Sequence, residues 1–148
     1  MLDLRDLYQE VIIDHNRNPR NCRAMDDATS HAEGFNPLCG DRLTLYLKIQ
    51  NDIVKDASFK GNGCAISTAS ASLMTESVIG KTLAEAKLLF QNFHDMLLKD
   101  DKTAEQKLGK LSVLAGVKAY PARVKCATLA WHTLNAAIEK KHETVSTE

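Results

Sequence analysis

Long apolar runs, an excess of charge of one sign and closely spaced cysteines are all missing from this chain of 148 residues. No apolar run approaches the roughly 18 to 20 residues that span a bilayer, and the first residues lack the basic and then apolar pattern of an export signal. Nineteen Lys and Arg balance nineteen Asp and Glu, and no basic stripe is interleaved with aromatic residues. We therefore expect a cytoplasmic protein that binds neither membranes nor nucleic acids.

Cysteine is scarce and widely spread, with four residues at Cys22, Cys39, Cys64 and Cys126. This pattern excludes a disulfide-stapled mini-protein, and a reducing compartment would keep all four side chains as thiols. Proline is also scarce, with three residues, while 44% of the chain is hydrophobic. This composition is typical of one ordinary globular domain, so metal binding or thiol chemistry is the role to consider for the cysteines.

The N-terminal part of the chain predicts a helix followed by a loop. Apolar side chains recur at helical spacing over residues 3–16, and Asp3 can cap the first turn. Pro19 ends this helix, because proline disfavours the helical conformation of the residue before it. Residues 20–38 show neither the helical nor the strand period, so we predict a loop in which a third strand could lie.

Two strands are predicted next. Residues 42–50 alternate cleanly, with four aliphatic side chains on one face and polar or charged side chains on the other. Residues 53–60 alternate less cleanly, with Ala57 and Phe59 able to share the core face. The turn residues Asn51-Asp52 between them indicate an antiparallel hairpin.

Two helices are predicted in the middle of the chain. Residues 65–79 are rich in Ala, Ser and Thr, and this helix ends at Gly80. Thr82 and Glu85 stand three apart ahead of an apolar run, which is the capping-box signature of a further helix that reaches about residue 98.

The last third of the chain predicts short helical turns and one long helix. Over residues 103–119 we expect one or two short turns that bury Leu108, Leu111 and Leu114. Pro121 suits the start of a long terminal helix, whose predicted buried stripe is Val124, Ala127, Trp131, Leu134 and Ile138. Residues 143–148 are expected to fray. The order of elements indicates a single α+β domain over residues 1–148, with helices packed on one face of a small antiparallel β-sheet.

Three cysteines fall where loops meet predicted elements. Cys39 precedes the first strand, Cys64 follows the second, and Cys126 lies in the first turns of the last helix. Because the start of one hairpin strand lies beside the end of the other, we expect Cys39 and Cys64 at the same edge of the sheet. Asp41 lies two residues after Cys39, and Gly40 between them lets both side chains turn toward one point.

Three thiolates and one carboxylate match the ligand preference of zinc. Such a site carries an excess of negative charge, and Arg123 and Lys125 flank Cys126 as available cations. Spacing alone leaves a second interpretation open, because a free cysteine often packs as a small buried hydrophobe. Cys22, which has no acidic or cysteine neighbour at ligand spacing, fits that interpretation and is left out of the site. The histidines also lack such neighbours and are expected at the surface or half-buried: His15, His31, His94, His132 and His142.

Three segments together resemble a known family. They are residues 36–41 (Asn-Pro-Leu-Cys-Gly-Asp), residues 59–72 around Gly-Asn-Gly-Cys, and residues 123–127 (Arg-Val-Lys-Cys-Ala). They resemble the iron-sulfur cluster scaffolds typified by IscU and by the N-terminal part of NifU. Within that family the chain looks most like the SufU branch, because Lys125 stands where the IscU branch has a histidine. The stretch from about residue 100 to 120 also looks like the SufU-type insertion.

The resemblance implies a zinc-dependent sulfurtransferase that partners a SufS-type, PLP-dependent cysteine desulfurase and supplies the downstream iron-sulfur assembly machinery. It implies Cys39, Asp41, Cys64 and Cys126 as zinc ligands, and Cys39 as the thiol that accepts persulfide sulfur. Two alternatives remain open. The first is a scaffold that holds a [2Fe-2S] cluster on the same ligands, and the second is a non-catalytic, zinc-containing activator of the desulfurase.

Overall fold

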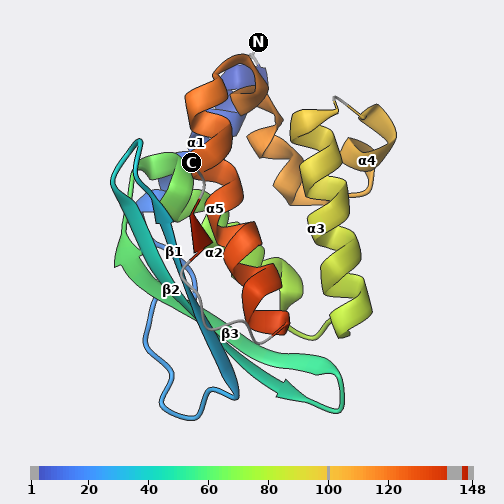
Figure 1. The fold of residues 1–148 in the computed structure, drawn as a ribbon. Coiled ribbons are helices and arrows are strands. Elements are labelled where there is room, and N and C mark those ends of the chain that lie inside the picture. The colour runs from blue at the N-terminus through green and yellow to red at the C-terminus, as the bar shows by residue number, and fades with distance from the viewer. Residues whose placement is uncertain (1–3, 100, 140–144, 147–148) are drawn as a thin grey trace.

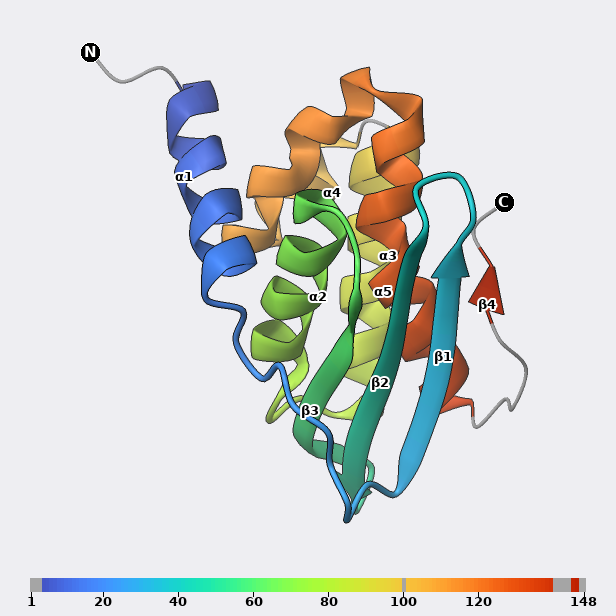
Figure 2. The ribbon, with the colours of Figure 1, turned by 90° about the vertical axis from the view of Figure 1, so that its left-hand side faces the viewer.

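The computed structural model describes residues 4–99, 101–139 and 145–146, and the side chains of residues 10–99 and 101–139. The strands form one sheet in the order β3-β2-β1-β4, and their bounds are β1 Ser30–Asn36, β2 Asp41–Gln50, β3 Ile53–Asn62 and β4 Val145–Ser146. The helical elements are α1 Leu4–Arg17, α2 Ala65–Val78, α3 Leu83–Leu98, α4 Lys102–Gln106, the 3-10 helix η1 Gly109–Ala119 and α5 Pro121–Ile138. Figures 1 and 2 show the helices stacked on one face of the sheet, which confirms the predicted α+β fold.

The predicted hairpin is present as β2 and β3. Leu43, Leu45 and Leu47 are buried on the core face of β2, as their alternation predicts. The connecting residues Asn51 and Asp52 both have positive φ, at 54° and 59°. Two such residues in a row form the turn whose twist matches that of an antiparallel strand pair, so the turn sets the register that places the start of β2 beside the end of β3.

The predicted loop over residues 20–38 contains a strand, β1, which pairs antiparallel with β2. Its inward-facing residues are Ser30, Ala32, Gly34 and Asn36. These side chains are small or polar, so the hydrophobic alternation that signals a strand is absent. Gly34 has a packing reason to be small, because a Cβ there would collide with Thr133 Oγ1 of α5.

Helix α5 is buried on nearly every side. Four residues of the predicted stripe are buried, whereas Val124 is half-buried. The stripe was incomplete, because the remaining sides of the helix are also covered: Thr128, Leu129, Ala130, Thr133, Ala136 and Ala137 are buried too. The helix lies between the sheet and the other helices and contacts β1, α2, α3 and η1. Beyond its first turn, only a narrow face of the helix is partly exposed, at Lys125, His132 and Asn135, so the buried side is much wider than a single stripe.

Helix α2 is rich in Ser because its hydroxyl groups serve buried contacts. Ser70 Oγ donates a hydrogen bond to the Ala127 carbonyl of α5 over 2.6 Å. Ser72 Oγ lies 2.6 Å from Nδ1 of His15 on α1. The His15 side chain is fully buried, so the prediction that it lies at the surface or half-buried was wrong. The α1–α2 contact encloses the ring.

The remaining helices follow their sequence signals. The capping box of Thr82 and Glu85 is formed at the start of α3, and α4 with η1 buries the three leucines predicted for residues 103–119. Asp3 lies outside the described residues. So does most of the predicted frayed end, except Val145–Ser146, which form β4 and pair parallel with β1. For these two residues the expectation of fraying was wrong.

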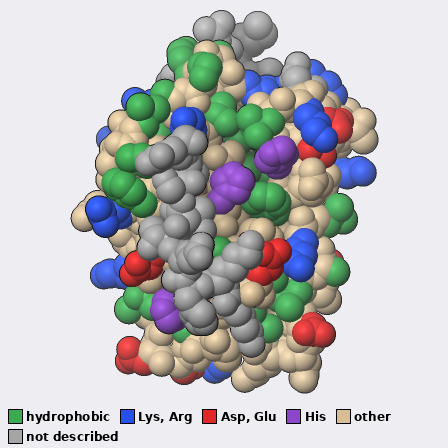
Figure 3. Space-filling view, in the orientation of Figure 1, with side chains coloured by type: hydrophobic (Ala, Val, Ile, Leu, Met, Phe, Trp, Pro, Cys, Tyr) green, Lys and Arg blue, Asp and Glu red, His purple; other side chains and the backbone are tan. Residues whose placement is uncertain are grey.

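The helices and the surface can also be compared with the predictions from hydropathy and charge. Among the described residues, no helix is long and apolar enough to cross a membrane. On the face drawn in Figure 3, basic and acidic side chains are interspersed.

Candidate metal centre

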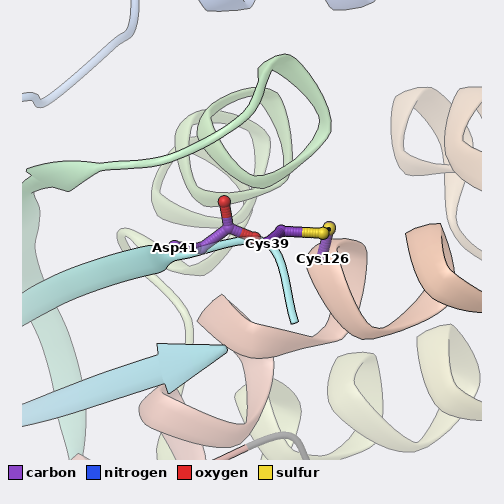
Figure 4. A group of neighbouring side chains, drawn as sticks. All are labelled: Cys39, Asp41 and Cys126. Atoms are coloured by element: carbon purple, nitrogen blue, oxygen red, sulfur yellow. Dashed lines mark hydrogen bonds between the residues drawn. The ribbon is translucent and has the colours of Figure 1, made fainter. Parts of the chain in front are cut away.

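The candidate centre lies where the β1–β2 loop meets the first turns of α5. The Sγ atoms of Cys39 and Cys126 are 3.2 Å apart. Together with a carboxylate oxygen of Asp41, they form a group whose donor atoms all lie within 4.8 Å of one another (Figure 4). Cys39 is exposed, whereas Asp41 and Cys126 are fully buried. Cys39 and Asp41 are neighbours in sequence, and the packing of α5 against β1 brings Cys126 to them.

The loop that carries Cys39 is tightly closed. Asn36 and Asp41 are paired across the end of the β1–β2 ladder, so residues 37–40 must turn the chain between them. Gly40 has a φ of 71°, a left-handed conformation that glycine adopts without strain. Asn36 Oδ1 accepts a hydrogen bond from the Leu38 amide over 3.3 Å. These features hold the exposed Cys39 in the loop, next to the buried donors Asp41 and Cys126.

Cys64 contacts the centre at Asp41. Its backbone amide donates a hydrogen bond to Asp41 Oδ1 over 2.8 Å, and its Sγ lies 4.0 Å from Asp41 Oδ2. The same sulfur caps the start of α2 by accepting a hydrogen bond from the Ser67 amide over 3.4 Å. The structure therefore places Cys64 beside Asp41, with its thiol outside the group of three that lie within 4.8 Å. For all four side chains to bind one ion, the Cys64 thiol would have to move closer to this group.

Gly63 permits the close approach of these segments. A Cβ at this position would lie 3.1 Å from Asp41 Oδ1 and 3.1 Å from atoms of Ser67. Any larger residue before Cys64 would therefore crowd Asp41 and Ser67, whatever the backbone conformation at this position.

Asn36 belongs to the centre and was missed as a candidate residue. Its side chain is fully buried, and Nδ2 donates hydrogen bonds to Asp41 Oδ2 over 3.1 Å and to Cys126 Sγ over 3.4 Å. The signal was present in the sequence, because an Asn-Pro pair precedes the Cys-Gly-Asp motif. It could not be interpreted without knowing that residue 36 faces inward at the end of a strand.

The pKa values of Cys126 and Arg123 are both raised, for different reasons. Burial raises the pKa of the Cys126 thiol, and the neighbouring Cys39, Asp41 and Cys64 groups raise it further. Hydrogen bonding with Cys126 raises the pKa of the exposed Arg123 guanidinium, as do the charges of the three nearby cysteines. Arg123 therefore places a positive charge beside the thiols of Cys39, Cys64 and Cys126. Lys125, the other flanking cation, is half-buried on α5.

The donor chemistry fits a metal that binds sulfur and oxygen. Thiolates with one carboxylate suit zinc, and thiolates also hold iron-sulfur clusters. Cys22 lies apart from this group, on a segment that pairs with the edge of β3 at Phe59. It is exposed, so the prediction that it packs as a small buried hydrophobe was wrong. All four cysteines are free thiols, which leaves Cys39, Cys64 and Cys126 available to a metal.

Comparisons with known proteins show which family the chain belongs to. A family model described as the NifU-like N terminal domain matches residues 7–127. The chain is 42% identical over 139 residues to the zinc-dependent sulfurtransferase SufU of Bacillus subtilis (strain 168), covering 94% of each chain. It is 44% identical over 134 residues to the iron-sulfur cluster assembly scaffold protein IscU of Thermotoga maritima, covering 90% of this chain and 94% of that protein.

A solved structure shows the same architecture. The crystal structure of the N-terminal part of a nitrogen-fixing NifU-like protein from Brucella abortus matches with a TM-score of 0.83 at 25% identity. The match covers 93% of this chain and 95% of the Brucella chain. The chain therefore belongs to the NifU-like N-terminal domain family of iron-sulfur cluster assembly proteins.

Proposed function

We propose that this protein is a zinc-dependent sulfurtransferase that accepts persulfide sulfur on Cys39 from a SufS-type, PLP-dependent cysteine desulfurase. The observation that best supports the proposal is the contrast between the exposed Cys39 thiol and the buried donors Asp41 and Cys126, all within 4.8 Å. An exposed thiol can meet a second protein, while buried donors can stay in place. The name of the Bacillus subtilis relative, which is 42% identical, supports the same function.

The metal ligands of this proposal are Cys39, Asp41, Cys64 and Cys126. A zinc ion, when bound, keeps its cysteine ligands as thiolates, including one whose burial opposes ionisation. Three thiolates and a carboxylate exceed the charge of one divalent ion, and the Arg123 guanidinium beside the thiols offsets part of the excess. The residues present therefore suit a zinc site in charge and in donor type.

The transfer step conserves atoms and electrons. The Cys39 thiolate attacks the outer sulfur of the persulfide on the desulfurase cysteine. A new S–S bond forms on Cys39 Sγ, the S–S bond of the donor breaks, and the donor cysteine leaves as a thiolate. No external oxidant or reductant is consumed, because sulfane sulfur moves from one cysteine to another.

The surroundings of Cys39 suit contact with a partner protein. Leu38 is 62% exposed and Tyr120 is 64% exposed, and they lie on the two segments that carry Cys39 and Cys126. Exposed aromatic and aliphatic side chains next to a reactive group are typical of protein contact surfaces. We propose that the desulfurase docks on this rim, and that the downstream assembly machinery then takes the sulfur in the reducing cytoplasm.

A second candidate function is supported by the Thermotoga maritima relative, which is named as an iron-sulfur cluster scaffold. The same thiols would then hold a [2Fe-2S] cluster. The metal content of the purified protein separates the two functions. A colourless protein with zinc supports the sulfurtransferase, whereas a brown protein that retains iron and sulfide supports the scaffold.

Replacing Cys39 tests sulfur acceptance against a purely activating role. With Cys39→Ala, we expect stimulation of alanine production by the desulfurase to disappear, while Cys22→Ala, away from the centre, keeps it. If Cys39→Ala retains both bound zinc and full stimulation, the protein is a non-catalytic activator and transfer through Cys39 is wrong.

A further inference from the structure

The buried side chain of Asn36 connects three parts of the candidate centre. It ends β1 opposite Asp41 in the strand register, and residues directly opposite each other in such a ladder place their side chains side by side. Its amide group makes three hydrogen bonds: Oδ1 accepts from the Leu38 amide, while Nδ2 donates to Asp41 Oδ2 and to Cys126 Sγ. One side chain thus links the exposed loop, the carboxylate and the buried thiol.

The donors of the centre differ in how firmly the protein holds them. Asp41 receives a hydrogen bond on each oxygen, from Asn36 Nδ2 and from the Cys64 amide. Cys126 is fully buried on α5 and receives the second Nδ2 hydrogen bond of Asn36. Cys39, by contrast, is exposed on the loop beside Gly40, and its sulfur is in contact with the Cys126 sulfur.

A hydrogen bond donated to a sulfur or carboxylate ligand fixes the direction of the ligand, which holds it in place for a metal. The same hydrogen bond draws charge away from a thiolate and so makes it a weaker nucleophile. We infer that Asn36 is a positioning residue that makes Asp41 and Cys126 the fixed donors of the centre and leaves Cys39 as the exchangeable one. This inference rests on the proposed function, since a sulfur carrier needs one ligand to be released.

The variant Asn36→Asp tests the inference with little change in shape. It keeps an acceptor for the Leu38 amide, removes both Nδ2 donors, and places a second carboxylate beside Asp41. We expect zinc affinity to fall by about ten- to a hundredfold, as for other groups that orient metal ligands. Competition with a chromophoric zinc chelator measures the affinity. The absorption bands of the cobalt-substituted protein should also shift, because they depend on the identity and geometry of the ligands.

Thr133→Val is the matched control. Thr133 is fully buried, and its hydroxyl donates to the Leu129 carbonyl of α5 over 2.7 Å, so the variant also removes one buried hydrogen bond. We expect its zinc affinity and its cobalt spectrum to match those of the wild type. A loss of less than about tenfold in Asn36→Asp, or an equal loss in Thr133→Val, would overturn the positioning role.

A measurement on the wild-type protein covers the case in which Asn36→Asp does not fold. In protein loaded with ¹¹³Cd, the Nδ2 protons of Asn36 should exchange slowly and show scalar coupling to the metal through the Cys126 sulfur. Rapid exchange without coupling contradicts the inference. None of these measurements uses a desulfurase, so their failure is distinguishable from a failure of sulfur transfer to Cys39.

Discussion

The backbone amide of Cys64 donates a hydrogen bond to Oδ1 of Asp41 over 2.8 Å, which ties the start of α2 to the start of β2. Asp41 is fully buried, so this carboxylate organises the centre before any metal binds. Its two oxygens serve two donors from different parts of the chain, the Cys64 amide and the Asn36 side chain.

Asp41→Ala should therefore loosen zinc binding and also weaken the metal-free fold. We expect zinc affinity to fall by more than about a hundredfold, since groups that merely orient ligands already contribute ten- to a hundredfold. Each buried donor left unpaired costs about 1 to 3 kcal/mol. Chelator competition and urea unfolding measure the two effects. Asp27→Ala is the control, because Asp27 is an exposed carboxylate paired with Lys48. Zinc affinity that stays unchanged in Asp41→Ala would remove Asp41 from the ligands.

Gly63→Ala should disturb the centre through steric contact alone. The added Cβ would lie 3.1 Å from Asp41 Oδ1, so the carboxylate has to move, and we expect zinc affinity to fall by about tenfold. Gly116→Ala in η1 is the matched control, because a Cβ there meets nothing within 4 Å. It should change the free energy of unfolding by less than about 0.5 kcal/mol and leave zinc binding unchanged. Equal zinc affinities in the two variants would contradict the close packing at Gly63.

The buried His15 ring predicts a loss of stability in mild acid. Burial lowers the pKa of His15 from its ordinary 6.5. The charge of Arg20 lowers this pKa further, while the charge of Glu76 acts in the opposite direction. As the pH falls through about 6.5, the unfolded chain therefore takes up a proton that the folded protein excludes. Stability attributable to this group is full above that pH and is lost below it.

His15→Asn removes the titrating ring and keeps a side-chain amide that can reach Ser72. The difference in free energy of unfolding between wild type and His15→Asn should shrink as the pH falls from 7.5 to 5. His31→Asn is the control, since His31 is exposed on β1 and its ring is in water in both states. Urea unfolding at several pH values measures both differences. A His15→Asn difference that is constant with pH would contradict the buried, neutral ring.

The sequence predicted the parts of the fold whose side chains follow a simple period. The leucines of β2 mark a strand because one face is aliphatic, and Thr82 with Glu85 marks the start of α3 because the capping box is local. A third strand was allowed for within the predicted loop over residues 20–38, but β1 could not be located there because its core face consists of Ser, Ala, Gly and Asn. The stripe on α5 was incomplete because its small residues allow packing on most sides of the helix.

The centre was predictable to the same limited extent. The hairpin alone places Cys39 and Cys64 near one edge of the sheet. The contact between Cys39 and Cys126 depends on how α5 packs against β1. The spacing of residues along the chain does not reveal this packing, so only the resemblance to a known family implied that Cys126 belongs to the centre. Asn36 could not be identified, because its role depends on the strand that the periodicity did not show.

The location of transferred sulfur tests the central claim most directly. The zinc-loaded protein would be incubated with a cysteine desulfurase and cysteine, digested without reductant, and analysed by mass spectrometry of the cysteine peptides. We predict one added sulfur atom on the peptide that contains Cys39, and none on those that contain Cys22, Cys64 or Cys126. Added sulfur on another cysteine, or stimulation of the desulfurase with no added sulfur on Cys39, would contradict the account.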